Sequence, residues 1–122
     1  MSGSDLGRVR DILGCVEAIA RAEATAQRYP KDSDVGWVAL EAVQHRVVAI
    51  GEAVTSLSLD MREDHPAVAW SELERMSDQI GQHDDQLDLQ TVLAIIGQPL
   101  KNLQAACRAI LAESVRIGED EP

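Results

Sequence analysis

Apolar residues recur along this chain every three or four positions, and polar residues fill the gaps between them. That spacing is the period of an α-helix, and the sequence lacks the every-second-residue alternation of a half-buried strand. The longest unbroken stripe falls in residues 34–57 and consists of Trp37, Leu40, Val43, Val47, Ile50, Val54 and Leu57. The sequence therefore predicts an all-α fold, with this stripe facing the core.

The segment before this stripe predicts a first helix over residues 5–28. Ser4 is placed to be its N-cap, because its hydroxyl can accept a hydrogen bond from a free amide of the first turn. The helix is expected to stop before Pro30, since a residue that precedes proline is pushed out of the helical region. Its apolar stripe is Leu6, Val9, Ile12, Leu13, Val16, Ile19 and Ala20.

The helix over residues 34–57 is expected to start from Ser33 or Asp32. Gly51 lies beside its apolar stripe. A missing side chain at that position would let a neighbouring segment approach closely, at a cost in helix propensity of roughly 1 kcal/mol relative to alanine.

A short third helix is predicted from Trp70 to about Gly81, with Leu73, Met76 and Ile80 on its buried face. Ser71 and Glu74 have the spacing of a capping box, in which each side chain bonds the other residue's backbone amide. Residues 58–69, which precede this helix, are predicted to be a connection.

The fourth helix is predicted over residues 89–115, with Asp88 as its cap. Its stripe is Val92, Ile95 or Ile96, Leu100, Leu103, Cys107, Ile110 and Leu111. Pro99 falls inside it and removes a backbone hydrogen bond, so a kink is expected near this residue. About four helices with brief connections predict an antiparallel up-and-down bundle. We expect one domain over residues 1–117 and an acidic tail over residues 118–122.

Composition refines this prediction. Aromatic residues make up only 2% of the chain, so the core must be aliphatic. Cys15 and Cys107 lie on or beside apolar faces, where a thiol behaves as a small hydrophobic group. The sequence shows neither a secretory leader nor a long apolar run, so we expect a reduced, cytoplasmic protein without a membrane segment.

The charge balance argues against non-specific binding to nucleic acid. Twenty-one acidic residues face eleven Lys and Arg residues, which gives a formal net charge of −10. Affinity for a phosphate backbone comes largely from cationic side chains that displace counterions. Between Met76 and Leu100 there is no Lys or Arg at all, although RNA cleavage needs cationic groups to stabilise the charge that develops on the phosphate.

Polar residues that could bind a metal or take part in catalysis gather around the end of the third helix. They are Arg75, Asp78, Gln82, His83, Asp84, Asp85 and Asp88. Adjacent residues rarely converge on one ion and no second histidine completes a helical ligand pair, so we expect no metal site and no cofactor. For general acid–base chemistry, His83 would transfer the proton and Arg75 would be its electrostatic partner. On a continuous helix these two would lie about 80° apart.

Four stretches of the sequence carry a resemblance to a known family. They are RDIL at residues 10–13, VAIGEAV at 48–54, AWSEL at 69–73 and LDLQTV at 87–92. Together they resemble the HepT-like family, the toxin half of the HepT/MNT toxin–antitoxin systems, over about residues 6–112. The resemblance implies an all-α bundle that dimerises and is encoded beside a small nucleotidyltransferase antitoxin. Active members are ribonucleases with a motif of Arg, four to six residues, His, one residue and Tyr, and the antitoxin adds adenylate groups to that Tyr.

This chain departs from that motif at every functional position. An ungapped alignment from Trp70 places Ser77 at the Arg position, Gln82 at the His position and Asp84 at the Tyr position. Asp84 has no phenolic hydroxyl to accept the modification, and the amide of Gln82 cannot move a proton near neutral pH. A shifted alignment recovers Arg75 and His83, but it leaves Asp85 in place of Tyr and breaks the register of the LDLQTV stretch.

Three functions follow as hypotheses. The first is a HepT-like protein with a degraded motif that acts as a binding or regulatory component, forms a homodimer and pairs with a nucleotidyltransferase. The second is an active ribonuclease toxin that binds RNA and uses Arg75 and His83 across a dimer cleft. The third, which depends on fold analogy alone, is the substrate-binding subunit of a split nucleotidyltransferase.

Overall fold

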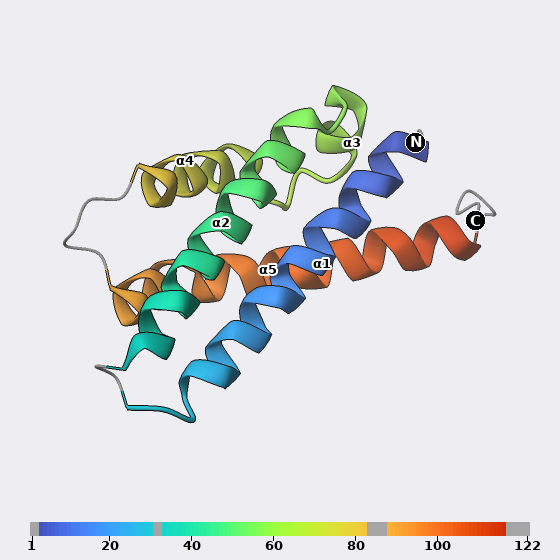
Figure 1. Ribbon diagram of the computed structural model, residues 1–122. Helices are drawn as coiled ribbons and strands as arrows, with labels where there is room; N and C mark the ends of the chain where they lie inside the picture. Colours follow the sequence, from blue (N-terminus) through green and yellow to red (C-terminus); the bar gives the residue numbers. More distant parts are fainter. Residues whose placement is uncertain (1–2, 31–32, 83–87, 117–122) are drawn as a thin grey trace.

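The computed structural model describes residues 3–30, 33–82 and 88–116 (Figure 1). All regular structure in these residues is helical, which confirms the predicted all-α class. The helices are α1 (Gly3–Ala26), α2 (Asp34–Ser56), α3 (Leu59–Asp64), α4 (Trp70–Gly81) and α5 (Leu89–Arg116). Asp32, His83, Asp84 and Asp85 and the acidic tail lie outside the described residues.

The helices form the predicted bundle around one antiparallel pair. Figure 1 shows α1 and α2 side by side and running in opposite directions. α4 packs on α2, and α5 runs obliquely across the pair and makes most of its contacts with α1.

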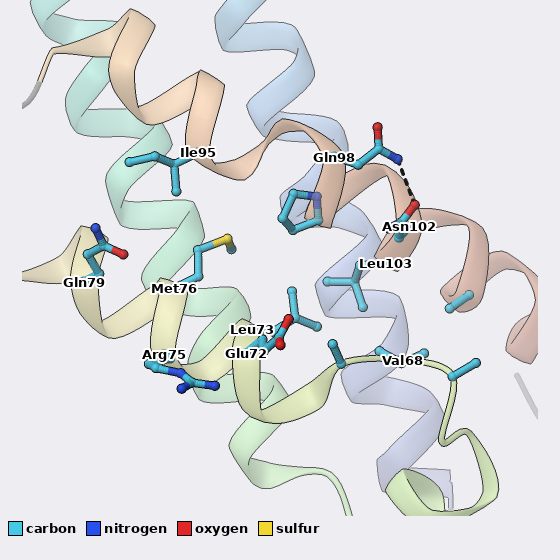
Figure 2. Close-up of a pocket in the computed structure, with 14 residues that line it drawn as sticks. Val68, Glu72, Leu73, Arg75, Met76, Gln79, Ile95, Gln98, Asn102 and Leu103 are labelled. Atoms are coloured by element: carbon cyan, nitrogen blue, oxygen red, sulfur yellow. Dashed lines mark hydrogen bonds between the residues drawn. The ribbon is translucent and has the colours of Figure 1, made fainter.

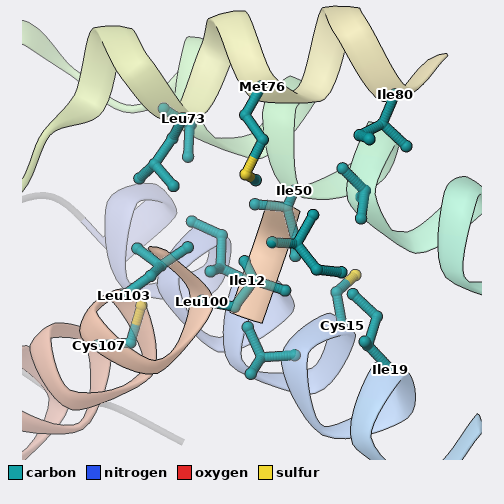
Figure 3. Close-up of a cluster of buried hydrophobic side chains, with 14 of the residues drawn as sticks. Ile12, Cys15, Ile19, Ile50, Leu73, Met76, Ile80, Leu100, Leu103 and Cys107 are labelled. Carbon is teal, nitrogen blue, oxygen red and sulfur yellow. The ribbon is translucent and has the colours of Figure 1, made fainter. Parts of the chain in front are cut away.

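The core of the bundle is aliphatic, as the composition predicts. Figure 3 shows Ile12 of α1, Ile50 of α2, Leu73 of α4 and Leu103 of α5 converging on its centre. The stripe of α2 is buried from Leu40 onward, but Trp37 is 65% exposed, so its predicted place in the core is wrong. Trp37 lies in the first turn of α2.

Both cysteines are buried, as predicted, and neither forms a disulfide. Burial raises the pKa of the Cys107 thiol to about 12, because the charged thiolate is disfavoured in an apolar environment. Pro99 lies inside α5, which remains helical on both sides of it. The kink expected at this residue stays a prediction.

The predicted caps have mixed outcomes. Asp88 does cap α5, because its carboxylate accepts a hydrogen bond from the backbone amide of Thr91 at 2.8 Å. Ser33 is the N-cap residue of α2 but makes no capping bond through its side chain. Ser4 lies inside α1, and the capping box in α4 is wrong: the N-cap is Ala69, so Ser71 lies within the helix.

The predicted connection over residues 58–69 contains a helix, α3, that the sequence analysis missed. Ser58 caps it by accepting a hydrogen bond from the amide of Met61 at 3.1 Å. The amide and hydroxyl of Ser58 donate in turn to the carboxylate of Asp5, at 2.9 and 2.6 Å. Asp5 is only 2% exposed, so this buried contact fixes the start of α3 against α1.

Candidate functional site

Two of the three positions that the ungapped alignment assigns to the family motif line one groove between α2 and α4. Ser77 and Gln82 contribute to it from α4, and the groove has a volume of about 630 Å³. We call it the motif groove. Its other lining residues are Val48, Gly51, Glu52, Thr55, Ser56, Glu74, Asp78 and Gly81.

Gly51 of α2 and Ser77 of α4 lie in close contact where they line the motif groove. A Cβ atom placed on Gly51 would lie 1.9 Å from Oγ and 2.4 Å from Cβ of Ser77. The close approach expected at Gly51 is therefore confirmed, and α4 is the neighbour. Ser77 is only 5% exposed, so the position that holds Arg in the motif is here occupied by a small side chain packed against α2.

The walls of the motif groove are acidic. Glu52, Glu74 and Asp78 line it, and no Lys or Arg is among its described lining residues. Glu74 accepts a hydrogen bond from the Thr55 hydroxyl at 2.6 Å and forms an ion pair with Arg62 at 3.1 Å. The Thr55 hydrogen bond and then the Arg62 hydrogen bond hold the pKa of Glu74 below its ordinary value, so its carboxylate stays charged at neutral pH.

Arg62 and Trp70 hold α3 in place through hydrogen bonds to backbone carbonyl oxygens. The Arg62 guanidinium donates to the carbonyl oxygen of Val54 at the end of α2, with its closer nitrogen at 2.8 Å. The indole N–H of Trp70, a residue that carries the family resemblance, donates to the carbonyl oxygens of Arg62 at 3.2 Å and His65 at 3.1 Å. These bonds tie α3 to the neighbouring ends of α2 and α4.

Arg75 lies on the other flank of α4. It lines a separate groove of about 660 Å³ between α4 and α5, together with Glu72, Gln79 and Pro99 (Figure 2). The structure therefore does not bring Arg75 into the motif groove with Ser77 and Gln82. Its predicted partner His83 and the motif position Asp84 lie outside the described residues.

A family model described as "Ribonuclease HepT-like" matches residues 15–110 of the chain. The chain belongs to the HepT-like ribonuclease family. This confirms the resemblance, and the match spans the motif groove and all three motif positions. No curated protein and no solved structure matches the chain significantly.

The HepT-like domain has a third groove that the sequence analysis missed. It lies between α1 and α2, has a volume of about 590 Å³, and is lined by four of the eleven basic residues of the chain, namely Arg8, Arg10, Arg21 and Arg46. We call it the arginine groove. One face of α1 carries, at helical spacing, Arg10, Gly14, Ala18 and Arg21, and this spacing could have indicated the α1 side of the groove. The side that α2 contributes depends on tertiary packing.

Within residues 3–30, 33–82 and 88–116, no three His, Cys, Asp or Glu residues are grouped so that they could hold a metal ion. None of the helices in these segments combines the length and the apolar character needed to cross a membrane.

Proposed function

We propose that this HepT-like protein is a binding or regulatory component of a toxin–antitoxin-type pair, with a degraded catalytic motif. In this proposal it forms a homodimer and associates with a nucleotidyltransferase. The observation that carries the proposal is the composition of the motif groove, in which three carboxylates line the walls and the described lining includes no Lys or Arg.

Such a groove is poorly suited to phosphodiester cleavage. Catalysis of this reaction requires a cation near the phosphate, where negative charge develops, and a group that transfers a proton near neutral pH. Ser77 is neutral and buried at the Arg position, and Gln82 carries an amide at the His position. Glu52 and Asp78 would instead repel a phosphate backbone, whereas Glu74 is paired with Arg62.

The absence of a motif tyrosine changes what a nucleotidyltransferase could do to this protein. Tyr29 is the only tyrosine in the sequence, and it lies 50% exposed beyond the end of α1, far along the chain from the motif. An adenylate group could therefore not be placed on a tyrosine at the motif position. We propose that the nucleotidyltransferase acts by binding the HepT-like fold itself and not by modifying a tyrosine at the motif position.

Expression in bacterial cells, alone and together with a nucleotidyltransferase, which the proposal places in the adjacent reading frame, tests this proposal. We expect no growth arrest from the chain alone, and a stable complex when the two are co-expressed and purified. Growth arrest that is relieved by His83→Ala or Arg75→Ala would instead support the active ribonuclease. Failure of the two chains to co-purify would contradict the proposed pairing.

A further inference from the structure

The groove between α4 and α5 has the size and the lining of a small-molecule site. Its volume of about 660 Å³ falls within the range of roughly 300–1,000 Å³ that such sites occupy, and helical bundles hold them between their helices. We call it the α4/α5 groove. Most of its lining residues are apolar, namely Ala67, Val68, Ala69, Leu73, Met76, Ile95, Pro99, Leu103 and Ala106.

The floor of the α4/α5 groove is continuous with the core. α4 packs on α2 and α5 packs mainly on α1, so the two helices stand apart on the surface of the α1/α2 pair. Figure 2 shows Leu73 and Met76 of α4 and Leu103 of α5 directed into the space between them. All three side chains are buried. A hydrocarbon chain lying on them would be removed from water at each point of contact.

The rim of the groove offers one positive charge. Arg75 is exposed, is the only Lys or Arg in the described lining, and makes no ion pair or hydrogen bond with any described residue. Glu72, the only carboxylate in that lining, lies one turn earlier on α4. On the opposite wall the amides of Gln98 and Asn102 bond each other at 2.9 Å. An anionic group of a ligand is therefore favoured beside Arg75 and disfavoured one turn away.

Pro99 adds a hydrogen-bond acceptor to the α5 wall. Because proline has no N–H group, the carbonyl oxygen of Ile95 lacks the amide donor that an uninterrupted helix would supply. Ile95 and Pro99 lie four residues apart and both line the groove, so this oxygen lies on the groove face of α5. A backbone acceptor that has lost its helical partner favours a ligand that carries an N–H group.

We propose that the α4/α5 groove binds a small amphiphile with an apolar chain, an N–H group and a carboxylate end, which is the chemistry of an N-acylated amino acid. The chain lies on Leu73, Met76 and Leu103. The N–H group donates to the carbonyl oxygen of Ile95, and the carboxylate accepts from the guanidinium of Arg75. This site shares no residue with the motif groove, so it goes beyond the proposed function and does not depend on it.

Titration of the purified protein with N-decanoylglycine, followed by calorimetry, tests the site. Two analogues each remove one feature of this probe: N-decanoylsarcosine carries a methyl group in place of the N–H hydrogen, and the methyl ester of N-decanoylglycine carries no charge. We expect saturable binding of N-decanoylglycine to the wild type. The affinity should fall about fivefold for the sarcosine analogue and about tenfold for the ester, because a bond to a charged group contributes more than a neutral one.

Three variants connect these preferences to the proposed contacts. Arg75→Gln should remove the preference for the acid over the ester, and Arg108→Gln, an exposed arginine outside the groove, should keep it. Pro99→Ala returns an amide donor to Ile95 and should remove the preference for the glycine over the sarcosine compound. Ala106→Leu narrows the groove and should weaken binding of all three compounds.

Ala105→Leu is the matched control for the last variant, because Ala105 is the exposed neighbour of Ala106 and does not line the groove. It should bind like the wild type, and circular dichroism should give the same helix content for every variant. Absence of saturable binding to the wild type would contradict the proposal. Binding that Ala106→Leu leaves unchanged would contradict this location, and an equal loss for acid and ester in Arg75→Gln would contradict the contact with the carboxylate.

Discussion

At the residue scale, the contact between Gly51 and Ser77 sets how closely α2 and α4 pack. The space that a side chain on Gly51 would need is filled by the hydroxyl and Cβ of Ser77. The pair therefore has to be small on both sides, and it occupies the floor of the motif groove. A long cationic side chain at position 77 would not fit into this contact, so the small residue at this position and the tight helix crossing are physically linked.

Gly51→Ala tests this contact. We expect the substitution to destabilise the protein by about 1–2 kcal/mol, because overpacking costs about 1–3 kcal/mol and the better helix propensity of alanine returns part of that. Chemical denaturation followed by circular dichroism measures the free energy of unfolding. Ser77→Gly in the Gly51→Ala background should recover part of the loss, since it removes the atoms that collide.

Gly97 provides the matched control, because a Cβ on this helical glycine would meet nothing within 4 Å. Gly97→Ala should leave stability unchanged or raise it by up to about 1 kcal/mol. Equal effects of Gly51→Ala and Gly97→Ala would show that the crossing does not depend on this contact.

At the scale of elements, Glu74 shows why local sequence signals predicted the helices but not all of their ends. Its spacing from Ser71 suggests a capping box, yet its carboxylate bonds Thr55 of α2 and Arg62 of α3. These partners are distant in the sequence, so no local pattern reveals them. α3 was missed for a related reason, because six residues are too few to show a helical period. The long stripes of α1, α2 and α5, by contrast, repeat over many turns.

Glu74→Gln tests the link between these elements through its dependence on pH. The folded-state pKa of Glu74 is lowered, so its charged form stabilises the fold above the ordinary carboxyl pKa of about 4.3, and this contribution is lost as pH falls through the lowered value. We expect the wild type to exceed Glu74→Gln by roughly 0.5–1 kcal/mol at neutral pH. That difference should shrink steadily as the pH is lowered from 5 toward 3.

The control for this series is Glu72→Gln, which removes an exposed carboxylate of α4 that has no ion pair with any described residue. Its free energy of unfolding relative to the wild type should not follow the same pH curve. A difference between wild type and Glu74→Gln that stays constant with pH would argue that the hydrogen bonds do not depend on the charge of Glu74.

At the scale of the whole molecule, the distribution of charge on the HepT-like fold is the observation that supports the proposed function. The sequence already indicated a motif region without cations, because no Lys or Arg occurs between Met76 and Leu100. It could not indicate that Glu52 of α2 would join Glu74 and Asp78 in one groove, or that Arg46 would meet the arginines of α1. Those groupings arise only when α2 packs against its two neighbours.

Incubation of the purified wild-type protein with labelled single-stranded RNA tests most directly the proposal that this motif groove does not support RNA cleavage. We expect cleavage no faster than in a protein-free blank, and no change in that rate in Arg75→Ala or His83→Ala. RNA cleavage by the wild type that either substitution abolishes would contradict the account.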